Sequence, residues 1–190
     1  MYDLNYNVGA GGQLSWNLDL VVGPPKTMAA NSIGQTSGLR RGEPAEIWLA
    51  IDAKSVMTEH GKARRNRQRD LNALHDIIHR RDPRTIVGGL IVVNIAPRFR
   101  SPLRTGDPTI HRNIDRLVAE TIQMYADLPS RTAPNEQGLD AMGVIVLSHS
   151  NIPGESTSLV QDARAPPRGS PVHYISFLER LCQSFGSRYA

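Results

Sequence analysis

Two long aliphatic runs constrain the fold of this chain more than any other feature. Residues 85–95 are almost all apolar apart from Gly88 and Gly89, and residues 141–148 form a second apolar run. Runs of this kind are typical of strands buried on both faces, as in parallel sheets. The paired glycines predict a close approach of another backbone. A helical pattern over residues 62–81 precedes the first run, so we expect a strand-helix-strand crossover.

The remaining elements follow from periodicity. Residues 16–22 and 46–56 alternate between apolar and mixed positions and predict two strands. Residues 109–128 and 172–185 predict two further helices, and residues 1–15 an irregular opening segment. Residues 23–45 and 151–171 are rich in Pro and Gly and predict long loops. We expect one α/β domain over residues 1–190, with a mixed central β-sheet flanked by helices.

Composition excludes several classes of protein. The chain is 39% hydrophobic but has no apolar run near the roughly 18 residues of a membrane span. Its first twenty residues lack the apolar stretch of a secretory signal, and Cys182 is its one cysteine, which rules out an internal disulfide. We therefore expect a soluble, cytoplasmic protein that does not bind membranes.

Positive charge is concentrated in one predicted helix. The net charge of the chain is +4, whereas residues 62–81 alone hold seven cations against two anions. These cations are Lys62, Arg64, Arg65, Arg67, Arg69, Arg80 and Arg81. A clustered cationic face indicates an anionic partner, although a solvated helix face is the alternative.

Three polar residues interrupt the first two predicted strands. Asp19 lies in the first strand, and Asp52 and Lys54 share one face of the second. If the two strands pair as an antiparallel hairpin, the two carboxylates come within a few ångströms of each other. Such carboxylates share a proton or bind a divalent cation, and Mg²⁺ or Mn²⁺ suits oxygen ligands. A metal beside a lysine is suited to phosphodiester hydrolysis.

The order Asp19, then Asp52-Ala53-Lys54, then a helix and a buried strand resembles the PD-(D/E)xK, or restriction-endonuclease-like, nuclease superfamily. The segment from Asp52 to Arg64 looks most like catalytic domains of bacterial restriction enzymes. The resemblance implies an Mg²⁺-dependent endonuclease, with Mn²⁺ as a substitute, that cleaves double-stranded DNA in a restriction or anti-phage system. It also implies that Asp19, Asp52 and the Ala53 carbonyl bind the metal and that Lys54 acts on the nucleophilic water.

The sequence also suggests residues around this centre. Lys62, Arg64, Arg65 and Arg67 are candidate contacts to DNA phosphates, and Arg98, Arg100 and Arg104 in a Pro-rich loop are weaker ones. Glu59 and His60 follow the second strand closely enough to reach the site, or they simply begin a helix. A homodimer, a further DNA-recognition domain and a larger parent protein all stay open. The alternative function is a non-catalytic DNA-binding or scaffold module on a degenerate nuclease fold.

Overall fold

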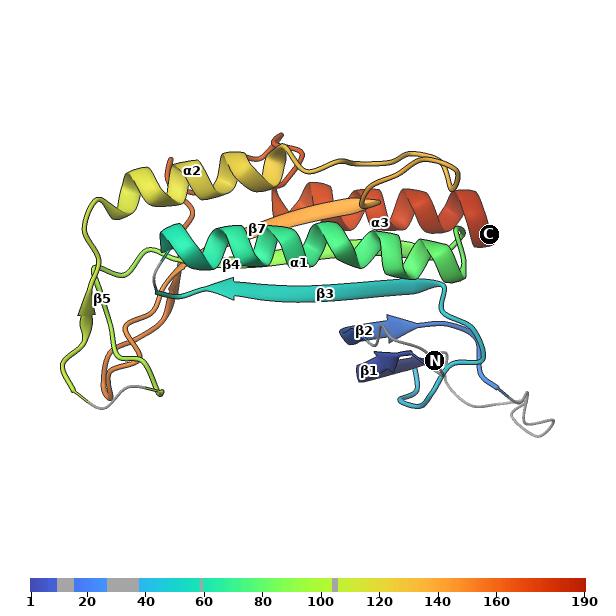
Figure 1. Ribbon diagram of the computed structural model, residues 1–190, viewed down its shortest axis with the longest axis horizontal. Helices are drawn as coiled ribbons and strands as arrows, with labels where there is room; N and C mark the ends of the chain where they lie inside the picture. The colour runs from blue at the N-terminus through green and yellow to red at the C-terminus, as the bar shows by residue number, and fades with distance from the viewer. Residues whose placement is uncertain (10–15, 27–37, 59, 104–105) are drawn as a thin grey trace.

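The computed structural model describes residues 1–9, 16–26, 38–58, 60–103 and 106–190. Within them a six-stranded mixed sheet is flanked by three helices (Figure 1), which confirms the predicted α/β class. The sheet has the order β1-β2-β3-β4-β7-β8. Its strands are β1 (Tyr2–Val8), β2 (Trp16–Val22), β3 (Leu49–Val56), β4 (Ile86–Asn94), β7 (Ala141–Ser148) and β8 (Ser158–Leu159). The helices are α1 (His60–Arg81), α2 (Ile114–Ala126) and α3 (Tyr174–Tyr189).

The centre of the sheet is parallel and its flanks are antiparallel. β3 pairs with β4, and β4 with β7, in parallel register, with Asp52 opposite Gly89 and Ile91 opposite Val144. β1, β2 and β8 add antiparallel pairs outside this core. The expected crossover is therefore confirmed: α1 connects β3 to its parallel neighbour β4.

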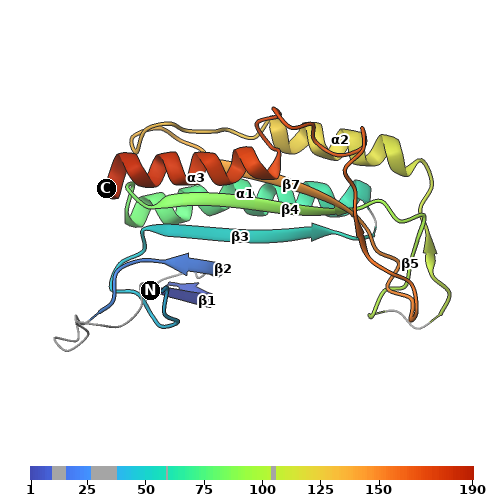
Figure 2. The same ribbon diagram turned by 180° about the vertical axis from the view of Figure 1, so that it is seen from behind.

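Helices cover both faces of the sheet. α1 and α2 lie on one face, and α3 covers the other, as the view from behind shows (Figure 2). Leu71, Leu74 and Ile78 of α1 pack into the larger core, while Phe177 and Leu181 of α3 pack against the opposite face. The face of α1 that meets the sheet is therefore its apolar stripe, as its periodicity predicts.

The two glycines of β4 make room for side chains and not for a backbone, so that prediction is wrong. A Cβ on Gly88 would lie 3.1 Å from a ring carbon of Phe177. A Cβ on Gly89 would lie 2.9 Å from the Met142 sulfur. Large side chains of α3 and β7 reach the sheet at these positions, because β4 is buried on both faces.

Two predicted boundaries are also wrong. Residues 2–8 form strand β1, paired antiparallel with β2, although we expected residues 1–15 to be irregular. Asn5 within this strand has a positive φ of 54°, yet the register between β1 and β2 is the same on both sides of it. The helix expected over residues 109–128 begins only at Ile114, because Asn113 before it adopts a left-handed conformation.

Part of that predicted helix belongs instead to a small ribbon. β5 (Arg98–Phe99) and β6 (Thr109–Ile110) pair antiparallel outside the main sheet. The long loops predicted at residues 23–45 and 151–171 hold no helix in their described parts, and β8 is the one strand there. Within the described residues, no helix combines the length and apolarity that a membrane span requires.

Candidate metal and phosphate site

The candidate site lies where β2 separates from β3. These strands pair antiparallel, as predicted, but only between residues 20–22 and 49–51. One step further along this register, Asp19 is opposite Asp52. There the Asp19 side chain replaces a strand partner, because its Oδ2 accepts a hydrogen bond from the Ala53 amide at 2.6 Å. The geometry brings together the two aspartates that the sequence singles out.

Asp52 is fully buried, with 0% of its surface exposed. It shares a face of β3 with Ala50 and Val56, both part of the core beneath α1. Its Oδ1 accepts a hydrogen bond from Lys54 Nζ at 2.6 Å, whereas its Oδ2 has no hydrogen-bond partner. Asp52 is therefore a carboxylate held in the core and not one at a solvated sheet edge.

The electrostatics of Asp52 reflect this burial. Desolvation raises the pKa of its carboxyl to about 6, the hydrogen bond and charge of Lys54 oppose the rise, and the Asp19 carboxyl adds to it. The ionised form of Asp52 is therefore destabilised in the metal-free protein. A buried carboxylate with one unpartnered oxygen is a group that a second cation would stabilise.

The donor set suits a hard divalent cation. Asp19 and Asp52 supply carboxylate oxygens, and Ala53, which follows Asp52 in the chain and whose amide donates to Asp19, would supply its carbonyl. Among the described residues, no group of three or more His, Cys, Asp or Glu side chains is placed to hold a metal. An ion here would take its remaining ligands from backbone and water, which Mg²⁺ commonly does.

Lys54 is held between two groups. Its Nζ pairs with Asp52, and it also lies 6.0 Å from the centre of the Trp16 ring in β2. A cation over an indole face is attracted by the ring quadrupole. Sequence reasoning missed Trp16, because strict alternation places it on the face of β2 opposite Asp19. That argument is weakened because residues 16–19, which precede Leu20, are not paired with β3.

The two residues suggested next to the site remain open. Glu59 lies outside the described residues, and so does the side chain of His60, whose backbone begins α1. Their proposed contribution to the site therefore stays a prediction.

Most of the exposed cations on α1 point away from this site. Lys62, Arg65 and Arg69 are exposed and share one helix face by their spacing. With 100° per residue, that face is opposite the buried stripe of Leu71, Leu74 and Ile78. The stripe packs on the sheet face that carries Asp52, so phosphates bound by these cations would lie on a different surface.

The other two candidates on α1 have partners. Arg64 is only 11% exposed, and its Nη1 lies 2.8 Å from Glu120 of α2. Its carbonyl also accepts a hydrogen bond from the Tyr125 hydroxyl at 3.0 Å, so Arg64 joins the two helices. Arg67 pairs with Asp70 at 3.1 Å and remains partly exposed.

Comparison with known proteins adds no assignment to this geometry. No family model, curated protein or solved structure matches the chain. The functional argument therefore depends on the residues themselves.

Proposed function

We propose that the protein is an Mg²⁺-dependent endonuclease that hydrolyses DNA phosphodiester bonds, with the catalytic arrangement of the restriction-endonuclease-like superfamily. The observation that carries the proposal is the buried Asp52 carboxylate, with one oxygen on Lys54, the other unpartnered, and Asp19 beside it. A buried carboxylate with one unpartnered oxygen would be stabilised by a further positive charge. The adjacent lysine supplies the second group that phosphodiester hydrolysis uses.

Each residue then has a chemical task. Asp19, Asp52 and the Ala53 carbonyl would hold the cation, which when bound polarises the phosphate and lowers the pKa of a coordinated water. Lys54 donates a hydrogen bond to Asp52 in the protein alone. If a bound cation took over the pairing with Asp52, the Lys54 ammonium would become available. It could then orient the attacking water and neutralise charge that develops on the phosphate. The Trp16 ring, 6.0 Å from the ammonium, would attract it on the β2 side.

The biological setting follows from the resemblance. We place the activity in a restriction or anti-phage system acting on double-stranded DNA inside the cell. Lys62, Arg65 and Arg67 are candidate phosphate contacts outside the cleavage site, whereas Arg64 contributes first to the packing of α1 on α2.

A second function has one observation in its favour. Lys54 pairs with the buried Asp52 carboxylate at 2.6 Å, which is also how a purely structural buried ion pair is built. A non-catalytic DNA-binding module on the same fold would retain such a pair as a structural element. Calorimetric titration with Mn²⁺ separates the two functions, since only the nuclease requires the ion to bind at Asp19 and Asp52.

Plasmid nicking tests the nuclease proposal directly. Supercoiled DNA is incubated with the parent, Asp52→Asn and Lys54→Ala in Mg²⁺, with EDTA as a second condition. Glu179→Gln, which makes the same charge change on the exposed surface of α3, is the matched control for Asp52→Asn. We expect the parent and the control to nick in Mg²⁺ alone and both site variants to lose at least a hundredfold in rate. Equal nicking by the site variants, or nicking in EDTA, would contradict the assignment.

A further inference from the structure

The β5–β6 ribbon is a firmly anchored projection. Phe99 is buried at its base, where its ring meets that of His149 edge to face at 5.8 Å. The Arg100 amide donates to the Ser150 carbonyl at 2.8 Å, and Asn151 donates to the Arg100 carbonyl at 2.6 Å. The ribbon is thus fixed to the chain that leaves β7, and its other face is free to meet a partner.

That outward face combines cations with an apolar side chain. Arg98 is opposite Ile110 in the ribbon, and residues paired in this way share a face. Arg98 also forms an ion pair with Glu155, yet its side chain is 57% exposed, and that of Ile110 is 75% exposed. Arg100 and Arg112 lie just beyond the ends of the two short strands, and both are exposed.

Leu103 lies beyond the ribbon and is the most exposed large hydrophobic residue of the described chain, at 93%. Asp107 is the one acidic residue between positions 97 and 113. The surface therefore offers positive charge and projecting aliphatic groups at the same place. Exposed single aliphatic side chains are common on protein surfaces, so the combination of these groups with the arginines is the feature that distinguishes this surface.

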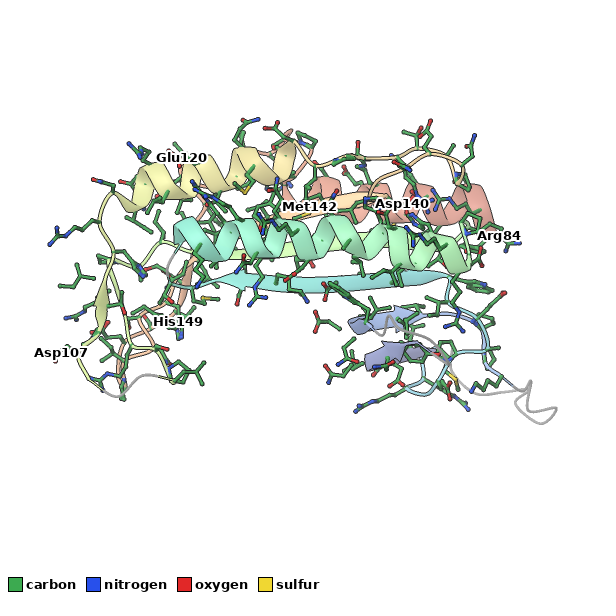
Figure 3. The ribbon with its side chains drawn as sticks, in the orientation of Figure 1. Arg84, Asp107, Glu120, Asp140, Met142 and His149 are labelled. Atoms are coloured by element: carbon green, nitrogen blue, oxygen red, sulfur yellow. The ribbon has the colours of Figure 1, made fainter. Side chains whose placement is uncertain are left out.

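The ribbon also lies on the β2 side of β3, the side from which Asp19 approaches Asp52. It projects from the ends of β4 and β7 toward the side of β3 that carries the β1–β2 hairpin (Figures 1 and 2). Asp107 and His149 mark this projection in Figure 3. Among the described residues no strand pairs with β3 from Asp52 onward on its β2 side, where the Ala53 amide donates to the Asp19 side chain, and this segment lies between the two projections. A duplex crossing that open edge would meet the ribbon, whereas the Lys62 face of α1 is turned away.

We infer that the outward face of the β5–β6 ribbon, together with Leu103, contacts a groove of duplex DNA. Arg100 and Arg112 would lie on phosphates, which fixes position without reading sequence. Ile110 and Leu103 would lie against sugars and base edges, in the manner of ribbons and apolar wedges that enter DNA grooves. The inference rests on the proposed function, because DNA is the partner that a nuclease site supplies.

Salt dependence of binding separates the two kinds of contact. A labelled 20-base-pair duplex is titrated with the parent chain in EDTA, where no cleavage is expected, at several salt concentrations. Each phosphate contact contributes about 0.9 to the slope of log affinity against log salt. We expect Arg100→Gln combined with Arg112→Gln to reduce that slope by about two. Leu103→Ser should weaken binding about fivefold and leave the slope unchanged, because it removes apolar contact and no charge.

Two controls match these changes elsewhere on the surface. Leu159→Ser alters another exposed leucine, and Arg81→Gln alters an exposed arginine at the opposite end of the molecule. Both should bind as the parent does. Unchanged affinity and slope in the ribbon variants, or binding to phosphatidylserine vesicles with none to DNA, overturns the inference.

The nicking assay keeps this outcome distinct from that of the proposed function. If the parent nicks DNA in Mg²⁺ while the ribbon variants bind DNA as the parent does, the nuclease proposal holds and the ribbon inference is refuted. If the parent never nicks DNA but its binding depends on Leu103, Arg100 and Arg112, the ribbon inference holds and the nuclease proposal is refuted.

Discussion

Replacement of Asp52 by asparagine should stabilise the metal-free protein at neutral and alkaline pH. Burial, opposed by Lys54 and aided by Asp19, raises the pKa of Asp52 from 3.8 to about 6. The folded state therefore binds the Asp52 proton more tightly than the unfolded state does. Its stabilising contribution is complete below about pH 3.8 and is lost as pH rises through about 6.

The magnitude follows from the size of the shift. About two pKa units at 1.36 kcal/mol each set an upper limit of about 3 kcal/mol on the cost of the ionised carboxylate above pH 6. Asparagine keeps the shape of the protonated acid and removes that cost. Lys54 loses its charged partner, but its side chain is 20% exposed and water can replace part of the interaction. We expect a net gain of about 2 kcal/mol at pH 8 and almost none at pH 3.5.

Urea denaturation in EDTA, followed by circular dichroism at both pH values, measures the difference. Asp107→Asn, with the same change in charge on an exposed loop, should alter the unfolding free energy by less than about 0.5 kcal/mol. Added Mg²⁺ should stabilise the parent by about 1.4 kcal/mol at ten times its dissociation constant, and should leave Asp52→Asn unaffected. A loss of stability in Asp52→Asn at pH 8 would refute the argument, because the Asp52–Lys54 pair would then be a net stabilising interaction.

Two further predictions concern the buried charges at the opposite end of the sheet. Asp140→Asn should destabilise the protein by about 4 kcal/mol in urea denaturation, because it leaves the buried guanidinium groups of Arg131 and Arg188 without their shared anion; a loss below about 1 kcal/mol would contradict this reasoning. His79→Gln should reduce the loss of stability on acidification, since burial and then the charge of Arg131 lower the pKa of His79 to about 4, and unfolding at pH 5 must protonate it. Denaturation curves at pH 5 and 7 measure that reduction, and an unchanged difference between them would count against it.

Short-range patterns predicted the fold where burial is uniform along an element. The run from Ile86 to Asn94 and the alternation in β3 are set by which face meets the core, so periodicity alone indicates them. Periodicity failed where one residue changes the backbone. Asn5 and Asn113 both adopt positive φ, and near them a strand was missed and a helix was predicted too early.

The site shows a similar division. The pairing of Asp19 with Asp52 was predictable, because antiparallel register follows from two alternating strands joined by a loop. The burial of Asp52 was not, because Ala50 and Val56 on the same face admit either solvent or a helix above them. The direction of the α1 cations was available from the helix period, since Lys62 and Arg65 fall opposite the apolar stripe that must face the sheet. The helix period therefore excludes that a phosphate bound by Lys62 and Arg65 lies at the Asp52 site.

Asp52 and His79 have opposite effects on the unfolding free energy in the same pH window. Between about pH 4 and 6, unfolding releases a proton from Asp52 and takes one up at His79, so their contributions to the pH slope cancel. Asp52→Asn should therefore uncover a rise in unfolding free energy of about 1.4 kcal/mol per pH unit across the middle of this window. His79→Gln should shift the slope by a similar amount in the opposite direction, and the double variant should retain the rise contributed by His75, whose pKa burial also lowers. A parent and an Asp52→Asn variant with parallel profiles would show that Asp52 ionises normally, and the main electrostatic support for a cation site would be lost.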